Sequence, residues 1–179
     1  MGSHSSISQK SPASVDKCDF KRYDERDRFR MIRNMNHEIL RVYADGTPYP
    51  TAEFAQRPVP RSQADKDGVE FNMRWYKRKN NIQRPNGIPV VFQIKVNGSD
   101  YHLCCPKEGT RLMFKEGEAP AKVKQNMNII FFQQYLDGQY HKFESAWAQG
   151  WFLCTKDHTL AMKTADGTDE MIAIGLDTL

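Results

Sequence analysis

The chain has 179 residues, 39% of them hydrophobic and 11% aromatic, and its 26 basic and 22 acidic residues leave a net charge of +4. Global disorder is excluded, because the charge imbalance is small and the apolar content is sufficient for a hydrophobic core. No apolar run approaches the roughly 20 residues of a membrane-spanning helix, and residues 1–19 contain no apolar stretch of the signal-peptide kind. We therefore expect a soluble chain made in the cytosol.

The first 19 residues differ in composition from the rest. They contain six serines, one proline and little apolar material. Such a segment cannot offset the entropy cost of becoming ordered, so it predicts a flexible leader. The remainder, residues 20–179, is expected to form one domain, whose core runs from about residue 28 to 175.

Short runs rich in Val, Ile, Phe, Tyr and Trp follow the leader, each about five to eight residues long, which is typical of β-strands. Twelve strands are predicted, at residues 28–33, 38–43, 51–55, 69–76, 89–96, 100–105, 110–115, 128–135, 140–145, 151–155, 159–163 and 170–175. A surface loop is expected at 56–68, and helix only in short connections such as 120–125. The class is all-β, and periodicity alone fits a sandwich and a closed barrel equally well.

The strongest turn signal is Asn97-Gly98, since both central residues of a two-residue hairpin of this type need positive φ. It predicts a hairpin between the strands on either side. Alternation within the strands also predicts a set of large apolar side chains that face inward. This set is Phe92, Ile94, Leu103, Leu112, Ile130, Phe132, Phe143, Phe152 and Leu153.

The sequence offers little for catalysis or metal binding. HExxH, GxSxG, GxGxxG and Walker-type spacings are absent. Cys154 is followed by Asp157 and His158, but it lies in an apolar strand, where a buried, unreactive thiol is the more frequent outcome. The four cysteines lack metal-ligand spacing, so we expect thiols rather than disulfides. The chain is predicted not to be an enzyme and to need no cofactor or metal.

A basic stretch runs from Arg74 to Lys79 and, with Arg84, places five basic residues within eleven positions without an acid. Because aromatic residues are interleaved, binding of RNA or single-stranded DNA is one interpretation. The other is a strand, 71–76, that runs into a solvated basic loop. The small net charge disfavours a nucleic-acid binder, and five acids among the last 23 residues suit docking to a protein instead.

Two segments near the C-terminus carry a family signature. Phe143-Glu144-Ser145-Ala146, followed after four residues by Trp151-Phe152-Leu153-Cys154-Thr155, resembles the signature of the interleukin-1 cytokine family, although the proline common between the two halves is absent. Three further stretches, at residues 32–36, 114–120 and 128–133, are most similar to the interleukin-18 branch of that family. The resemblance extends from about residue 28 to 174.

This resemblance implies a β-trefoil, with twelve strands in three pseudo-repeats, six closing a barrel and six capping it. It also implies a secreted, monomeric, pro-inflammatory cytokine of the immune response, made as a cytoplasmic precursor and released without a signal peptide. A caspase would remove the leader after Asp19, with Asp16 as the second candidate, and residues 16–19 resemble the preference of executioner caspases. The implied partners are a cell-surface primary receptor, an accessory receptor and a soluble binding protein.

Four positions match receptor contacts in that branch. Arg33 corresponds to a receptor-facing arginine and Arg28 to a basic residue of a second face. Ile88 takes an apolar position on the basic hairpin, and Lys115 aligns with a lysine implicated in recruiting the accessory receptor. Three further family contacts, a lysine, an acid and an arginine, are replaced here by Asp24, His37 and Gln134.

Several interpretations stay open on the sequence. Another branch of the same family would act as a receptor antagonist or as an intracellular binding protein. A sugar-binding trefoil lectin would share the fold, but the repeated Gln-x-Trp triplets of such lectins are absent. If the leader lies beside Arg28 and Arg33, it masks them in the precursor.

Overall fold

The computed structural model describes residues 20–45, 49–78, 87–105, 111–167 and 169–178. Their strands join one hydrogen-bonded sheet of 14 strands. The strands are β1 (Phe20–Arg22), β2 (Phe29–Arg33), β3 (Ile39–Tyr43), β4 (Thr51–Ala55), β5 (Glu70–Arg78), β6 (Ile88–Val96), β7 (Ser99–Cys104), β8 (Met113–Glu116), β9 (Lys122–Val123), β10 (Phe131–Asp137), β11 (Tyr140–Ser145), β12 (Trp151–Lys156), β13 (Thr159–Thr164) and β14 (Ile174–Asp177). The helical elements are α2 (Gln63–Lys66), the 3-10 helix η1 (Met127–Ile129) and α3 (Asp169–Ile172). No helix of these residues has the length and apolar character needed to cross a membrane.

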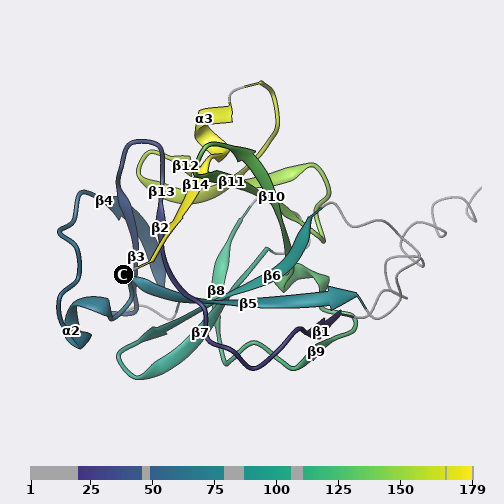
Figure 1. Ribbon diagram of the computed structural model, residues 1–179, viewed down its shortest axis with the longest axis horizontal. Coiled ribbons are helices and arrows are strands. Elements are labelled where there is room, and N and C mark those ends of the chain that lie inside the picture. The colour runs from purple at the N-terminus through teal and green to yellow at the C-terminus, as the bar shows by residue number, and fades with distance from the viewer. Residues whose placement is uncertain (1–19, 46–48, 79–86, 106–110, 168, 179) are drawn as a thin grey trace, which may run out of the picture.

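Six strands close a barrel. β2 pairs with β5, β5 with β6, β6 with β10, β10 with β11, β11 with β14 and β14 with β2, which completes the ring. Three hairpins, β3–β4, β7–β8 and β12–β13, continue from β2, β6 and β11 and form the cap (Figure 1). The order of barrel strand, two cap strands and barrel strand therefore occurs three times. The predicted twelve strands in three pseudo-repeats are confirmed. Of the two architectures that periodicity left open, the structure shows the closed barrel.

Two short strands, β1 and β9, were not predicted. β1 lies between β5 and β9, with Phe20 opposite Val123 (Figure 1). The helix expected at 120–125 is wrong, because Val123 is buried in this pairing and the segment is held extended. The strand expected at 170–175 is wrong in its first half, which forms α3 and buries Ile172 against Phe152 and Cys154.

The remaining local predictions fare better. Asn97 and Gly98 have φ of 52° and 85° and join β6 to β7, so the predicted hairpin is confirmed. The expected loop at 56–68 is interrupted by α2, where the Ser62 hydroxyl accepts a hydrogen bond from the backbone N–H of Asp65. Such a cap satisfies one of the unpaired N–H groups at a helix start.

The barrel interior is filled by phenylalanine rings. Phe92 meets Phe71, Phe131 and Phe143 edge-on, at centroid distances of 6.4, 5.6 and 5.0 Å. Of the nine predicted core residues, Leu112 is half-buried and the other eight are buried. A second, smaller core cluster lies beneath β1. It includes Phe20, Tyr76, Val91, Cys104, Val123 and Phe132.

Candidate functional site

Arg33 lies on β2 at the seam where β14 closes the barrel. Its Nε and Nη2 donate to the two carboxylate oxygens of Asp177, at 2.9 and 3.1 Å, and Nη1 donates to the hydroxyl of Tyr140 at 2.9 Å. The guanidinium also lies over the Tyr140 ring, 5.2 Å from its centroid. Hydrogen bonding to Asp177 raises the pKa of Arg33, so the side chain stays charged. We name Arg33, Tyr140 and Asp177 the Arg33 clasp.

A glycine provides the space for this clasp. Gly175 on β14 is the cross-strand partner of both Arg33 and Tyr140, and a Cβ there would lie 2.7 Å from Arg33 Nη2. With the guanidinium drawn in, the Arg33 side chain is only 12% exposed. The polar groups of Arg33 thus join three barrel strands, and its predicted contact with a receptor stays a prediction.

Arg28 is also engaged within the chain. Its two Nη atoms donate to the carboxylate of Asp24 at 3.1 and 2.9 Å, and its guanidinium carbon lies 4.2 Å from the centre of the Trp75 ring. The side chain is 9% exposed, and its hydrogen bonds lower the pKa of Asp24. Within the chain, Asp24 therefore neutralises Arg28, the cation that was expected on the second face.

An apolar groove of about 560 Å³ lies on the β5/β6 seam. Its lining residues are Tyr23, Trp75, Tyr76, Lys77, Arg78, Gly87, Ile88 and Pro89. Ile88 is 44% exposed and Tyr23 is 59% exposed. The Tyr76 hydroxyl donates to the Pro120 carbonyl, and burial raises its pKa to about 12, which keeps it protonated. Of the predicted residues, Ile88 lines this groove, whereas Arg28 only packs on Trp75, one of the lining residues.

The other predicted positions lie elsewhere. Lys115 is exposed on β8, opposite His102 of β7, and belongs to neither the Arg33 clasp nor the apolar groove. Asp16, Asp19 and the leader fall outside the described residues. Phe20, which follows Asp19, is fully buried in β1 and packs against Phe132 at a ring-centroid distance of 6.3 Å.

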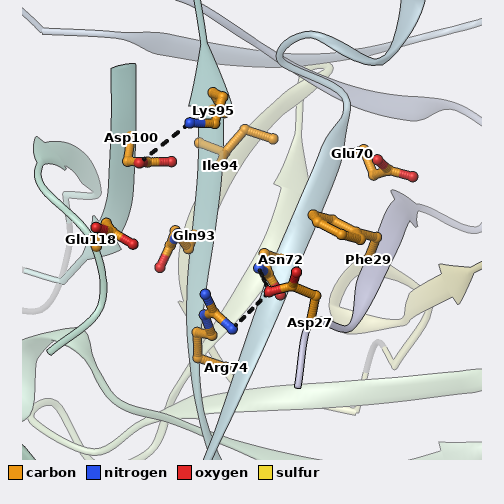
Figure 2. Close-up of a pocket in the computed structure, with 10 residues that line it drawn as sticks. All are labelled: Asp27, Phe29, Glu70, Asn72, Arg74, Gln93, Ile94, Lys95, Asp100 and Glu118. Carbon is orange, nitrogen blue, oxygen red and sulfur yellow. Dashed lines mark hydrogen bonds and ion pairs between the residues drawn. The ribbon is translucent and has the colours of Figure 1, made fainter. Parts of the chain in front are cut away.

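The basic stretch from Arg74 to Lys79 does not form one patch. Arg74 faces a polar cleft of about 220 Å³, where Nη1 donates to Asp27 at 3.1 Å (Figure 2). Arg78, one turn of the alternation past Tyr76, lies over the rings of Phe20 and Phe132 instead, 5.5 and 5.3 Å from their centroids. Lys79 and Arg84 lie outside the described residues. Among the described part of this stretch, Lys77 is the exposed cation.

The described residues show no activated nucleophile around the three buried cysteines. Burial raises the pKa of Cys104 to about 11 and also raises the pKa of Cys105 and Cys154. His158 Nδ1 lies 2.9 Å from Glu38 Oε2. The His158 ring therefore contacts the carboxylate of Glu38, the residue just before β3, rather than Cys154. Within the described ranges no group of three or more His, Cys, Asp and Glu could hold a metal ion.

Sequence reasoning missed the partners that decide how the predicted arginines behave. For Arg28, the i to i+4 spacing from Asp24 was a usable signal of pairing, and Trp75 was visible only as part of the basic stretch. Tyr140 and Asp177 are 107 and 144 residues from Arg33 along the chain, and nothing local joins them. Their contact requires the closed barrel.

Solved structures share this fold over most of its length. A mutant of Gallus interleukin-1 superimposes with a TM-score of 0.67, and chicken interleukin-1 beta with 0.63; each is 18% identical, with 89% of this chain and 99% of the other covered. An endo-β-galactosidase from Clostridium perfringens also matches, with a TM-score of 0.58 at 12% identity over 84% of this chain and 32% of the enzyme. At these identities the likeness shows the fold alone, which is the β-trefoil.

The sequence comparisons are more specific. The family model described as Interleukin-1 / 18 matches residues 61–174, which contain the signature segments, and the chain belongs to this family. Interleukin-18 of Gallus gallus is 29% identical over 133 residues, which are 72% of this chain and 64% of that protein. This chain therefore spans just under two thirds of the length of that relative. The members it matches are cytokines, proteins that act by binding.

Proposed function

We propose that the chain is an interleukin-18-like, pro-inflammatory cytokine that binds a primary cell-surface receptor and then recruits an accessory receptor. Its likeness to chicken interleukin-18 supports this branch of the family. The observation that carries receptor binding is the apolar groove, with Ile88 and Tyr23 exposed at its rim. Exposed apolar clusters of this kind mark interaction sites, and a few apolar anchors supply most of the affinity of an interface.

The proposal gives different roles to the four matched residues. Ile88 is the anchor of the primary face, since it is the exposed apolar side chain of the groove. Arg28 positions Trp75 from behind, because its charge is already paired with Asp24. Arg33 contacts the primary receptor only through the small part of its side chain that the Arg33 clasp leaves exposed. Lys115, exposed on β8, contacts the accessory receptor.

We further propose that residues 1–19 form a pro-segment that a caspase removes after Asp19 or, as second candidate, after Asp16. Phe20 supports the position, because it is the first residue of β1 and is buried. A cut further along would remove residues that pair with β5 and β9. Release without a signal peptide, control by a soluble binding protein and action as a monomer belong to the same proposal.

The test uses the full chain and its Asp19→Ala and Asp16→Ala variants. Each is incubated with an inflammatory and an executioner caspase, the new N-terminus is identified by mass spectrometry, and both forms are titrated against an interleukin-18-type receptor ectodomain. We expect cleavage after Asp19 and a gain in receptor affinity. Failure of both forms to bind would refute the proposal, and equal binding would remove any masking role for the leader. Binding without recruitment of the accessory receptor would identify an antagonist.

A further inference from the structure

The strand β1 lies between β5 and β9 (Figure 1), and the register of this pairing makes three lysines neighbours. In this register Lys21 is directly opposite Lys77 on one side and Lys122 on the other. Directly opposite residues share one face of a sheet, with neighbouring strands about 4.8 Å apart. All three side chains are exposed. We name Lys21, Lys77 and Lys122 the lysine row.

The nearby arginines are engaged within the chain, whereas the lysine row is not. Arg22 pairs with Glu25 at 3.7 Å, Arg28 pairs with Asp24, and Arg78 lies on two phenylalanine rings. Within the described residues, none of the three lysines of the row has an ion-pair partner. The row therefore concentrates positive charge that the fold itself does not neutralise.

The strands hold the row in place. Each lysine of the row is next in sequence to a buried residue of the second core cluster, namely Phe20, Tyr76 or Val123. These buried side chains hold one face of β1, β5 and β9 against the core, so the lysines face solvent. The lysines cannot leave the surface without breaking that core. Like charges directly opposite each other in a sheet are destabilising. An arrangement that costs stability without a compensating contact is expected at functional sites.

We propose that the lysine row binds a sulfated polysaccharide whose chain crosses the three strands. A straight row of ammonium groups is complementary to a linear polyanion, and lysine is a compact point charge that suits sulfate without bidentate geometry. Binding of single-stranded nucleic acid relies on aromatic rings that stack on bases, whereas all three members of the row are lysines. The choice of a saccharide also rests on the cytokine function proposed above, which places the protein among cell-surface chains.

The row also borders the apolar groove, because Lys77 belongs to both. A polysaccharide on the row would therefore meet a receptor bound in the groove at this residue. The test leaves Lys77 intact so that the two ligands are probed separately.

The experiment measures binding of the full chain to immobilised heparin over a range of salt concentrations. The double variant Lys21→Gln/Lys122→Gln is compared with Lys115→Gln/Lys156→Gln, which removes the same charge at exposed positions of β8 and β12. With a loss of about fivefold per lysine near an anionic surface, the row variant should bind about 25-fold more weakly. Its plot of log affinity against log salt should also flatten by about 1 to 2 units. The control variant should lose about twofold or less, because its two lysines lie on β8 and β12, outside the row.

Three outcomes would overturn the proposal. Equal losses in the two double variants would mean that net charge alone attracts heparin. Retained binding to heparin stripped of sulfate would exclude sulfate as the ligand group. Tighter binding to a single-stranded oligonucleotide of equal charge would assign the row to nucleic acid instead. Receptor binding of the row variant, measured in parallel, separates failure of this inference from failure of the cytokine proposal, and circular dichroism checks that the variant is folded.

Discussion

The β14/β2 and β5/β6 seams occupy equivalent places in the threefold barrel, yet the chain uses them in opposite ways. At the first, the Arg33 clasp pairs its polar groups internally and leaves the Arg33 side chain 12% exposed. At the second, Ile88 is 44% exposed at the rim of the apolar groove. Both residues were predicted from the sequence to contact a receptor. The difference shows that the residue type alone does not tell whether a side chain is free to contact a receptor. This depends on whether other groups at the same seam already bind that side chain.

The largest expected effect concerns the Arg33 clasp. Arg33→Ala removes an ion pair that spans three strands and leaves Asp177 without its partner, so the free energy of unfolding should fall by about 2 to 3 kcal/mol. Asp177 is 31% exposed, and water then offsets part of the loss. Urea denaturation measures the change. If the unfolding midpoint were unchanged and receptor binding were lost, Arg33 would be a receptor-contact residue and not a structural one.

The apolar groove should behave in the opposite manner. Ile88→Asp places a charge where an apolar anchor is proposed, and receptor binding should weaken by about 2 kcal/mol, or about 30-fold. The unfolding free energy should change by less than about 0.5 kcal/mol, since Ile88 is exposed. Val59→Asp is the matched control, because Val59 is 65% exposed and lies outside the groove. Similar losses from both variants would show that the groove is not the binding site.

Alkaline pH should lower the free energy of unfolding through the core cluster beneath β1. Cys104, in the cluster beneath β1, has its pKa raised by burial from 9.0 to about 11. Below pH 9 both states keep the proton, whereas between pH 9 and 11 the unfolded chain loses it first, so the unfolding free energy falls by about 1 to 2 kcal/mol. Tyr76 extends the fall toward pH 12. Urea midpoints at pH 8 and 10.5 test this, and the same fall in a Cys104→Ala variant would assign it to another group.

The smallest expected effect is a gain. Lys21→Glu places an acid between Lys77 and Lys122, which replaces two like-charge pairs with two opposite-charge pairs. The unfolding free energy should rise by about 0.5 to 1 kcal/mol, while heparin binding is lost. Thermal unfolding at low and high salt measures it, and the gain should shrink in salt. A loss of stability would mean that the row has a structural counter-charge.

The all-β class was predictable because its signals are local, whereas the β-trefoil followed from the family resemblance, since periodicity alone fits a sandwich and a barrel equally well. Alternation placed Phe92 and Phe143 inward, and Asn97-Gly98 set a hairpin that the φ values confirm. Predictions failed where a distant element decided the outcome. Val123 is extended because Phe20 pairs with it, and Ile172 is helical because it packs on Phe152.

The predicted site residues stay predictions, because the structure shows their surroundings and not their receptor contacts. Ile88 lines the groove and Arg28 packs on Trp75 beside it, but the pairing of Arg28 with Asp24 removes the cation that the family match implied. Likewise, the period of two along β5 divides the basic stretch, so that Arg74 enters a polar cleft and Lys77 faces solvent.

By itself the sequence determined most of the barrel and cap strands, the Asn97-Gly98 turn and the family, since these follow from short-range periodicity, turn chemistry and the signature segments. Tertiary structure alone decided which charges are satisfied. Asp177 reaches Arg33 across 144 residues, and Lys21 and Lys122 reach Lys77 only through the register of β1, β5 and β9. Cross-strand neighbours are set by barrel closure and register, which place residues far apart in the chain within the few ångströms over which charges act most strongly.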